Sequence, residues 1–260
     1  MNIPPSILAL LAIAQGAARE VMAVYASNFA VTAKADLSPV TEADARAEKL
    51  ILKGLAAGFP GIPVLAEEQA SRGHKPVLGE RFFLVDPLDG TKEFISRNGE
   101  FTINIALCEM GRVSEGVVYA PAIGRIYWGK CGIGAAAANL ELSDSAALVP
   151  WTPIHVREKP AGGVTVVASR SHMDAETEAY LDAIPQKTLV SAGSSLKFCL
   201  VASGEADLYP RFGRTMEWDT AAGQAVLEAA GGKVVTREGE ALTYGKAARG
   251  FDNPAFIASA

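Results

Sequence analysis

Residues 83–94 of this 260-residue chain read Phe-Leu-Val-Asp-Pro-Leu-Asp-Gly-Thr-Lys-Glu-Phe. The apolar run at 81–85 predicts a short buried strand. The strand should end in a tight turn, because a proline there fixes one φ angle and a glycine tolerates turn conformations. Two carboxylates, Asp86 and Asp89, are thus presented three residues apart. They would repel each other unless a cation lay between them, and a hard divalent ion with oxygen ligands meets that need.

The same letters also have an ordinary interpretation, since Asp-Pro and Asp-Gly are common turn dipeptides. Two distant acidic segments favour the metal site: Ala-Glu-Glu at 66–68, and Glu-Trp-Asp-Thr-Ala-Ala-Gly at 217–223. In the second segment, Trp218 and the small residues after Asp219 are interpreted as packing residues. Their size lets the start of a helix approach the ions closely.

Together the three segments resemble the metal-binding signature of the inositol monophosphatase superfamily of magnesium-dependent, lithium-sensitive phosphatases. Two longer strings, 86–94 and 193–202, resemble one branch of it, the bacterial 3′(2′),5′-bisphosphate nucleotidases. The resemblance covers at least residues 41–232. It implies a fold of the α+β or α/β class, with the layered αβαβα order of the sugar-phosphatase or inositol monophosphatase-like proteins.

The resemblance also implies ligands for two or three Mg²⁺ ions. Glu67, Asp86 and the backbone carbonyl of Leu88 would hold the first ion. Asp86, Asp89 and Asp219 would hold the second, so that Asp86 bridges the two. Two metal ions about 3.5–4 Å apart can activate a water and stabilise both the phosphoryl oxygens and the leaving group.

Further residues would handle the proton and the scissile phosphate. The resemblance places the hydroxyl of Thr91 between the attacking water and Asp44, and these two residues form the catalytic set with Glu67. Asp44 has an ordinary role as well, because the helix dipole favours an acid in the first turn by roughly 0.3–1 kcal/mol. The backbone N–H groups of Gly90 and Thr91, at a turn or helix start, are natural donors to the phosphate.

Three charged neighbours of these motifs have open roles. Lys92 and Glu93 belong to the nucleotidase version of the string, and they either form a surface ion pair or contact the site. Glu68, which follows the predicted ligand Glu67, is interpreted as a solvated charge at the end of a strand.

A second phosphate on the substrate would need its own binding groups, for which Ser194, Lys197 and Arg211 are the candidates. Lys197 interrupts an apolar run, 196–202, whose pattern predicts burial. Because a buried lysine is costly unless it is paired, an anion is expected near it. The resemblance places all three residues on the 5′-phosphate of a nucleotide.

Two assignments have simpler alternatives. Arg211 could instead be a buried structural partner of Glu205 or Asp207. His172 resembles a position that stacks on or bonds to adenine, yet a lone histidine after a strand is often only a turn residue. The resemblance implies further substrate contacts from Leu88, Asp89, Gly90, Thr91 and Asp219.

The composition excludes some classes of partner. Apolar residues form 49% of the chain and charged residues 20%, which is ordinary for a soluble globular protein. A net charge of −5 argues against a nucleic-acid polymer, which needs a basic face, but not against a small bisphosphorylated nucleotide. Three scattered cysteines favour a reduced, cytoplasmic protein over a disulfide framework.

The apolar run at 7–14 resembles the core of a signal peptide. No basic residue precedes it and it is too short to span a membrane, so no integral membrane segment is predicted. Apolar residues in 3- and 4-residue steps after Pro4-Pro5 indicate an amphipathic helix docked on the core. Peripheral attachment to the inner face of the cell membrane is the alternative.

Up to residue 129, local sequence patterns predict a series of helices, strands and loops. A polar connector at 34–41 leads to a helix capped by Thr41. A short strand at 63–66 delivers the first metal ligand, and 69–80 is interpreted as a mobile loop near the site. Residues 102–129 predict three antiparallel strands.

After residue 160 the pattern alternates between strands and helices. A domain boundary is predicted between 1–160, an α+β part with most metal ligands, and 161–260, an α/β part with the nucleotide-binding residues and the last metal ligand. The last predicted strand is 233–236.

These observations favour a magnesium-dependent phosphatase that converts adenosine 3′,5′-bisphosphate to AMP and phosphate. 3′-Phosphoadenylyl sulfate is a second candidate substrate, which would connect the protein with sulfur metabolism. The alternative is an inositol monophosphatase or a related sugar-phosphate phosphatase, which shares the metal ligands but lacks the 5′-phosphate clamp. A catalytically silent regulator would lack a ligand, and all four carboxylates are present. Nothing in the sequence indicates the oligomeric state.

Overall fold

The computed structural model describes residues 2–33, 39–158, 160–169 and 174–260. Its helices are α1 (Pro5–Tyr25), α2 (Glu42–Gly58), α3 (Glu67–Ser71), α4 (Thr91–Ile95), α5 (Ala175–Asp182), α6 (Leu196–Ala202) and α7 (Glu217–Ala229), with a 3-10 turn η1 (Ala247–Arg249). Two short strands, β1 (Val31–Ala33) and β2 (Pro39–Thr41), pair with each other.

Two larger sheets contain the remaining strands. The first has the order β3-β4-β5-β6-β7-β8-β9, formed by β3 (Val64–Ala66), β4 (Arg81–Asp89), β5 (Thr102–Glu109), β6 (Arg112–Ala120), β7 (Arg125–Lys130), β8 (Gly134–Asn139) and β9 (Thr152–Ile154). The second has the order β11-β10-β12-β14-β13, formed by β10 (Val164–Ser169), β11 (Lys187–Ala192), β12 (Leu208–Arg211), β13 (Lys233–Thr236) and β14 (Phe256–Ser259).

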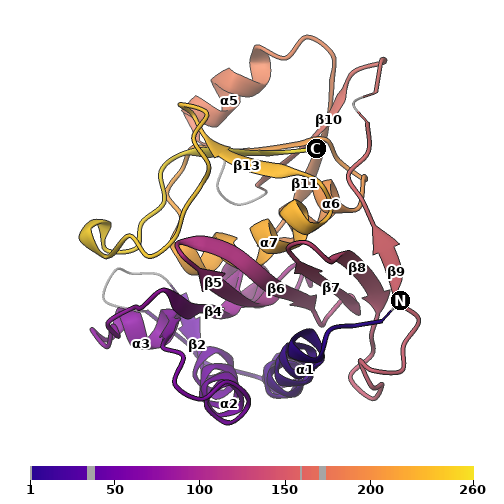
Figure 1. Ribbon diagram of the computed structural model, residues 1–260. Coiled ribbons are helices and arrows are strands. Elements are labelled where there is room, and N and C mark those ends of the chain that lie inside the picture. The colour runs from indigo at the N-terminus through magenta and orange to yellow at the C-terminus, as the bar shows by residue number, and fades with distance from the viewer. Residues whose placement is uncertain (1, 34–38, 159, 170–173) are drawn as a thin grey trace.

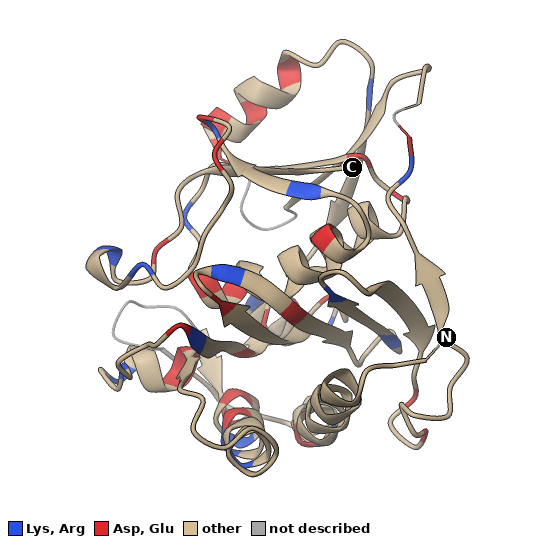
Figure 2. Ribbon diagram, viewed as in Figure 1, with Lys and Arg blue, Asp and Glu red and all other residues tan. Residues whose placement is uncertain are grey.

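The sheets and helices are stacked in five layers (Figure 1). Helices α1 and α2 cover one face of the first sheet, α6 and α7 lie between the sheets, and α5 covers the outer face of the second sheet. The αβαβα prediction is therefore confirmed. Lys and Arg are mixed with Asp and Glu on α2 and the first sheet, whereas the charged residues of α5 and α7 are all acidic and those in the strands of the second sheet are all basic (Figure 2).

Helix α1 docks on the first sheet through one apolar stripe. It begins at Pro5, with Pro4 at its N-cap, and its buried residues pack against α2, β5 and β6. The docked helix is confirmed. Within the described residues, α1 alone is long and apolar enough to cross a membrane, and half of that apolar window is buried inside the protein.

Helix α2 begins with the predicted cap. The Thr41 hydroxyl accepts a hydrogen bond from Ala43 N at 3.2 Å, and the Asp44 carboxylate accepts one from Thr41 N at 2.8 Å. The predicted connector before it was wrong where it is described, because β2 pairs antiparallel with β1. Residues 34–38 of that connector lie outside the described part of the chain.

Strand β4 is longer than predicted. It runs to Asp89 instead of ending at residue 85, with a register shift against β5 between Asp86 and Asp89. The additional residues of β4 pair with β5, and local strand propensity does not indicate such long-range pairing. The predicted meander of β5, β6 and β7 is confirmed. The predicted loop at 69–80 is shorter, since its first three residues belong to α3.

The predicted last strand is β13, but β14 follows it and lies between β12 and β13. Four residues with long-range partners give little local signal, which explains the omission. The predicted boundary at residue 160 falls between the strands of the two sheets and stays a prediction. One apolar core contains residues from both sheets, including Phe82 and Phe256.

Two glycines let α7 lie unusually close to the first sheet. A Cβ added at Gly116 would lie 2.7 Å from the Ala222 carbonyl oxygen, and one at Gly129 would lie 2.6 Å from the Ala225 carbonyl oxygen. These contacts are with backbone atoms, so the helix itself would have to move. The first turn of α7 contains Asp219, and the two glycines therefore fix the depth at which that carboxylate sits.

Gly129→Ala is expected to lower the free energy of unfolding by about 1–3 kcal/mol, as overpacking does in a dense core. For a chain of this size that corresponds to a Tm lower by roughly 2–12 °C, measurable by calorimetry. Gly58→Ala is the control, because an added Cβ meets nothing within 4 Å and the site is helical. Equal Tm values for Gly129→Ala and wild type would mean that α7 can shift without cost.

Candidate active site

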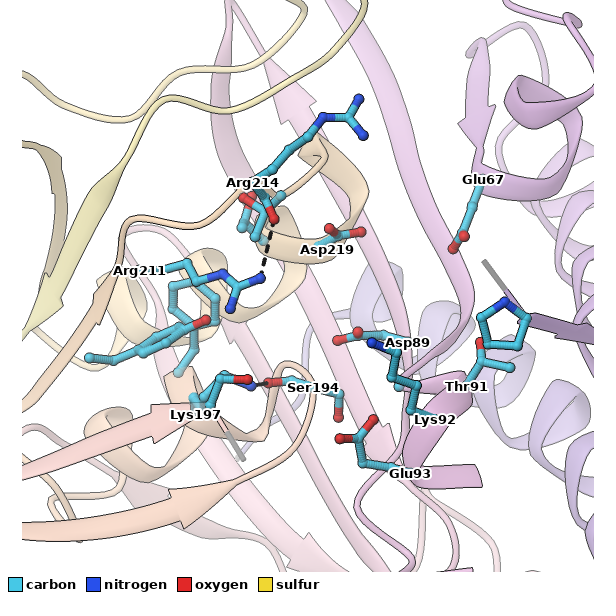
Figure 3. A pocket seen from close by; sticks show the side chains of 17 residues that line it. Glu67, Asp89, Thr91, Lys92, Glu93, Ser194, Lys197, Arg211, Arg214 and Asp219 are labelled. Atoms are coloured by element: carbon cyan, nitrogen blue, oxygen red, sulfur yellow. Dashed lines mark hydrogen bonds between the residues drawn. The ribbon is translucent and has the colours of Figure 1, made fainter. Parts of the chain in front are cut away.

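A cavity of about 280 Å³ opens where the ends of β4 and β12 meet the first turns of α4, α6 and α7 (Figure 3). Both sheets and segments far apart in the sequence contribute to it. The predicted site residues in its lining are Glu67, Asp89, Gly90, Thr91, Ser194, Lys197, Arg211 and Asp219. The structure thus brings these residues together, while their individual roles remain predictions.

Two of the predicted ligands, Asp86 and Leu88, lie outside the lining. Both are buried, and the Asp86 carboxylate accepts a hydrogen bond from Leu88 N at 3.0 Å. The turn after Asp89 depends on Gly90, whose φ of 91° is in the left-handed region. A Cβ at that position would lie 3.3 Å from Ser194 Cβ, which is a tight contact, so α4 and the turn before α6 approach each other closely at this glycine.

The four predicted carboxylate ligands interact electrostatically. Burial raises the pKa of Asp86 well above its usual value, and the charges of Glu67, Asp89 and Asp219 raise it further. Burial, followed by the charges of Asp89 and Glu67, likewise raises the pKa of Asp219. Burial raises the pKa of Asp89 to about 6, although the Lys197 ammonium opposes this. Asp86, Asp89 and Asp219 are thus destabilised in their ionised forms by burial and by neighbouring carboxylates.

This donor set fits a hard divalent cation, since it consists of oxygen ligands whose mutual repulsion a cation would relieve. Within the described residues, however, no three His, Cys, Asp or Glu side chains stand close enough to form a metal-binding group. Two of the carboxylates bond to backbone N–H groups: Asp86 to Leu88, and Asp219 to Met216 at 2.8 Å. Asp86 is the carboxylate on which the charges of Glu67, Asp89 and Asp219 act together.

Asp44 is buried beside the acidic region. Its Oδ2 accepts hydrogen bonds from both Thr41 N and Thr41 Oγ1, at 2.8 and 2.9 Å. Burial raises the pKa of Asp44 to about 6, against the effect of the two Thr41 bonds. The Thr91 hydroxyl lies 3.5 Å from the Leu88 carbonyl oxygen, at the limit of a hydrogen bond. The Asp44–Thr91 proton path stays a prediction.

The opposite wall of the cavity is cationic. Lys197 is nearly fully buried, as its apolar neighbours predicted, and its Nζ donates to the Ser194 carbonyl at 2.6 Å. Burial lowers the pKa of Lys197 to about 8, and the charge of Asp89 opposes that shift. The Arg211 guanidinium donates to the Arg214 carbonyl at 3.2 Å and faces the cavity (Figure 3).

Ser194 lies in the turn just before α6, and its φ of 39° is in the left-handed region. Its hydroxyl donates to the Glu100 carbonyl at 2.8 Å. Glu100 also accepts a hydrogen bond from Gly193 N at 2.8 Å, so this glutamate, which sequence reasoning missed, holds the turn in place.

The structural alternative for Arg211 loses support. Both carboxylate oxygens of Asp207 accept hydrogen bonds from Arg157, at 2.7 and 2.8 Å. Glu205 accepts one from Ser203. Arg211 instead lines the cavity. His172, predicted to contact adenine, lies outside the described residues.

Glu68 was wrongly predicted to be solvated, because it is buried. It lies in the first turn of α3, whose backbone N–H groups at Glu68 and Gln69 donate to the Glu48 carboxylate at 2.8 and 3.3 Å. Glu48 was missed by sequence reasoning, although an acid on a mostly apolar helix stripe was the available signal. Its effect is to hold α3, and with it Glu67, against α2.

Other lining residues were missed or left open. Lys92 and Glu93 both line the cavity, as the site alternative predicted, while their roles stay predictions. Glu93 is buried, while the Lys92 side chain points into the cavity beside Asp89 (Figure 3). Arg214, at the cavity's edge, bonds to Asp252 at 2.6 Å. Its position three residues after Arg211, beyond a strand end, was the only sequence signal.

The sequence matches the Inositol monophosphatase family over residues 5–255. It is 45% identical, over 95% of this chain and 96% of the relative, to the 3′(2′),5′-bisphosphate nucleotidase CysQ of Escherichia coli O157:H7. It is 40% identical, over 95% of this chain and 91% of the relative, to CysQ of Buchnera aphidicola subsp. Acyrthosiphon pisum.

Solved structures agree with this. CysQ from Bacteroides thetaiotaomicron, a bacterial member of the inositol monophosphatase family, superposes with a TM-score of 0.81 at 37% identity, over 98% of this chain and 96% of that one. The inositol monophosphatase of Thermotoga maritima gives a TM-score of 0.75 at 25% identity, over 96% and 89% of the two chains. The resemblance inferred from the sequence is confirmed, and the chain belongs to the inositol monophosphatase family.

Proposed function

We propose that the protein is a magnesium-dependent phosphatase that hydrolyses adenosine 3′,5′-bisphosphate to AMP and phosphate. One observation carries the proposal: a single cavity has a group of carboxylates at one wall and the cations Lys197 and Arg211 at another. A substrate with two phosphates can place its scissile phosphate at the first and its other phosphate at the second. The CysQ relatives, named for this activity, support the choice.

Magnesium would be held by Glu67, Asp86, Asp89 and Asp219, with the Leu88 carbonyl as a further ligand. When bound, Mg²⁺ supplies a water activated for attack and neutralises charge on the phosphoryl oxygens. The number of ions, two or three, is part of the proposal.

The chain's own groups then perform the remaining tasks. The backbone N–H groups of Gly90 and Thr91 orient the scissile phosphate. The Thr91 hydroxyl takes up the proton of the attacking water and passes its own toward Asp44. The water oxygen forms a bond to phosphorus as the bond from phosphorus to the 3′ oxygen breaks. The 3′ oxygen takes up a proton from solvent and leaves as the 3′-hydroxyl of AMP, and the proton passed to Asp44 returns to solvent. Lys197 and Arg211 hold the 5′-phosphate throughout.

3′-Phosphoadenylyl sulfate carries the same 3′-phosphate and a charged 5′ group, and we propose it as a second substrate. The remaining proposals are that the partner is this small bisphosphorylated nucleotide and that the enzyme works in the cytoplasm. The buried face of α1 supports docking of that helix on the protein over attachment to a membrane.

Phosphate release from three substrates tests the proposal: adenosine 3′,5′-bisphosphate, adenosine 3′-monophosphate and inositol 1-phosphate, each with Mg²⁺ and with excess EDTA. We expect kcat/KM to be highest for the bisphosphate, by roughly 10-fold or more, because charge-assisted hydrogen bonds to a second phosphate contribute about 1.5–3 kcal/mol. EDTA should abolish release.

Each alternative predicts a different result. A clear preference for inositol 1-phosphate would favour the inositol monophosphatase alternative. Full activity in EDTA would remove the metal from the mechanism. Absence of release from all three substrates with Mg²⁺ present would contradict the phosphatase proposal itself.

A further inference from the structure

Asn104, in the middle of β5, connects the parts of the site that come from the two sheets. It is fully buried and pairs with Asp86 across the β4–β5 ladder. Its side-chain Nδ2 donates to Asp89 Oδ2 at 3.3 Å and to Ser195 Oγ at 3.0 Å. Ser195 Oγ in turn donates to the Asp219 backbone carbonyl at 2.8 Å. A continuous hydrogen-bonded chain thus joins one predicted metal ligand to the backbone of another.

The direction of this chain is fixed by chemistry. An ionised carboxylate only accepts hydrogen bonds, so the Asp89 side chain must face the amide NH₂. Ser195 Oγ donates to the Asp219 carbonyl and accepts from Asn104, and it is also in hydrogen-bonding contact with the Asp89 carboxylate. Both donor positions of the amide are satisfied, and both are directed at the site.

The side-chain carbonyl of Asn104, unlike its NH₂ group, is not satisfied by a hydrogen bond from any described residue. Within the described part of the chain, Asn104 Oδ1 is buried and no group donates to it. A buried acceptor without a partner costs about 1–3 kcal/mol. A leucine of similar size would avoid this cost, but it would leave Asp89 and Ser195 without the donor that Asn104 supplies, so the asparagine is explained by its two contacts with the site.

We propose that Asn104 is a positioning residue for the magnesium site. It holds the Asp89 carboxylate in one orientation and, through Ser195, fixes the starts of α6 and α7 relative to β5. A neutral donor suits this position, because it bonds to a ligand carboxylate without adding a positive charge that would compete with the ion. The inference rests on the proposed magnesium-dependent function.

Asn104→Leu tests it. We expect the Mg²⁺ concentration for half-maximal activity to rise about 10–100-fold, the usual effect of removing a group that orients a metal ligand. A thermal-shift titration with Mg²⁺ alone, without substrate, should show the same loss of affinity for Mg²⁺. The metal-free Tm should change little, since removal of the unpaired carbonyl offsets the loss of the hydrogen bonds to Asp89 and Ser195. KM at saturating Mg²⁺ should stay within about 3-fold.

Two further variants complete the design. Ser195→Ala removes the hydroxyl oxygen from the same series of hydrogen bonds, and its effect on Mg²⁺ affinity should be non-additive with that of Asn104→Leu. It also tests the chain if the leucine variant does not fold. Thr102→Val is the matched control, because Thr102 lies on the same face of β5 and its hydroxyl is also buried without a partner in the described residues. It should leave Mg²⁺ affinity unchanged.

The outcomes separate the two proposals. Wild-type Mg²⁺ affinity in both Asn104→Leu and Ser195→Ala would overturn the positioning role and leave the proposed function standing. An equal loss of affinity in Thr102→Val would also overturn it, because the effect would then be one of general packing. A wild-type protein without any response to Mg²⁺ would defeat the proposed function instead.

Discussion

Asp86→Asn is expected to lower kcat/KM by at least about 10³-fold and, at the same time, to raise the Tm of the metal-free protein. The loss follows from the proposed bridging position of Asp86 between two ions. The gain follows from electrostatics, because burial and the charges of Glu67, Asp89 and Asp219 all oppose ionisation of this carboxyl. Asparagine has the same shape and keeps an acceptor for Leu88 N.

The size of the stability gain should depend on pH. The pKa of Asp86 is raised in the folded protein, so the folded state favours the protonated carboxyl. Near pH 3.8 and below, wild type and Asp86→Asn should therefore be equally stable with respect to this group. As the pH rises toward the raised pKa, wild type loses stability and the variant does not. At pH 8 we expect a difference of about 1–2 kcal/mol, or roughly 2–8 °C.

Calorimetry in EDTA and phosphate-release assays in Mg²⁺ measure the two effects. Asp182→Asn is the control, since this carboxylate is 86% exposed and far from the acidic group. It should change neither quantity. Full turnover by Asp86→Asn would contradict the two-ion proposal, and a lower metal-free Tm at pH 8 would show that repulsion among the carboxylates is not what limits stability.

Lys197→Met is expected to raise KM for adenosine 3′,5′-bisphosphate by about 10–100-fold, while KM for adenosine 3′-monophosphate changes less than about 3-fold. A charge-assisted hydrogen bond to phosphate contributes about 1.5–3 kcal/mol, which corresponds to this range. Lys197 is buried among apolar residues of α6, so methionine should be accommodated without unfolding. Steady-state kinetics with both substrates at saturating Mg²⁺ measure the effect.

Lys197 also lies close enough to Asp89 to influence its pKa, and that creates a second route to an effect. The two substrates separate the routes, because a damaged metal site would slow both of them equally. Arg211→Gln, at the same cationic wall, should reproduce the selective loss. Lys53→Met, an exposed change on α2, should leave both substrates unaffected. Equal losses on both substrates in Lys197→Met would remove the reason for assigning it to the 5′-phosphate.

Local signals were enough to predict much of this site. Asp86 and Asp89 belong to a strand–turn motif that can be recognised within twelve residues. Lys197 interrupts an apolar run, and that pattern predicted its burial. Glu67 and Asp219 were reached only through resemblance to a family, because nothing local connects them with β4. The structure then places both at the same cavity.

What the sequence did not show depends on long-range partners. Strand β14 forms because it pairs with both β12 and β13, and β4 extends to Asp89 because its last residues pair with β5. Asn104 and Glu48 are single polar residues in apolar patterns, and only the folded chain shows what they contact. Glu68 was misjudged for the same reason, since its burial depends on α2.

Within the acidic group, β4 and α3 contribute three carboxylates, and α7, which lies between the two sheets, contributes the fourth. Docking of α7 during folding must therefore bring like charges together against their repulsion. Divalent cations present at that moment would screen the encounter and lower its kinetic barrier. The concentration of divalent cations around the protein would then set the rate at which new chains fold, as well as the catalytic rate of folded ones.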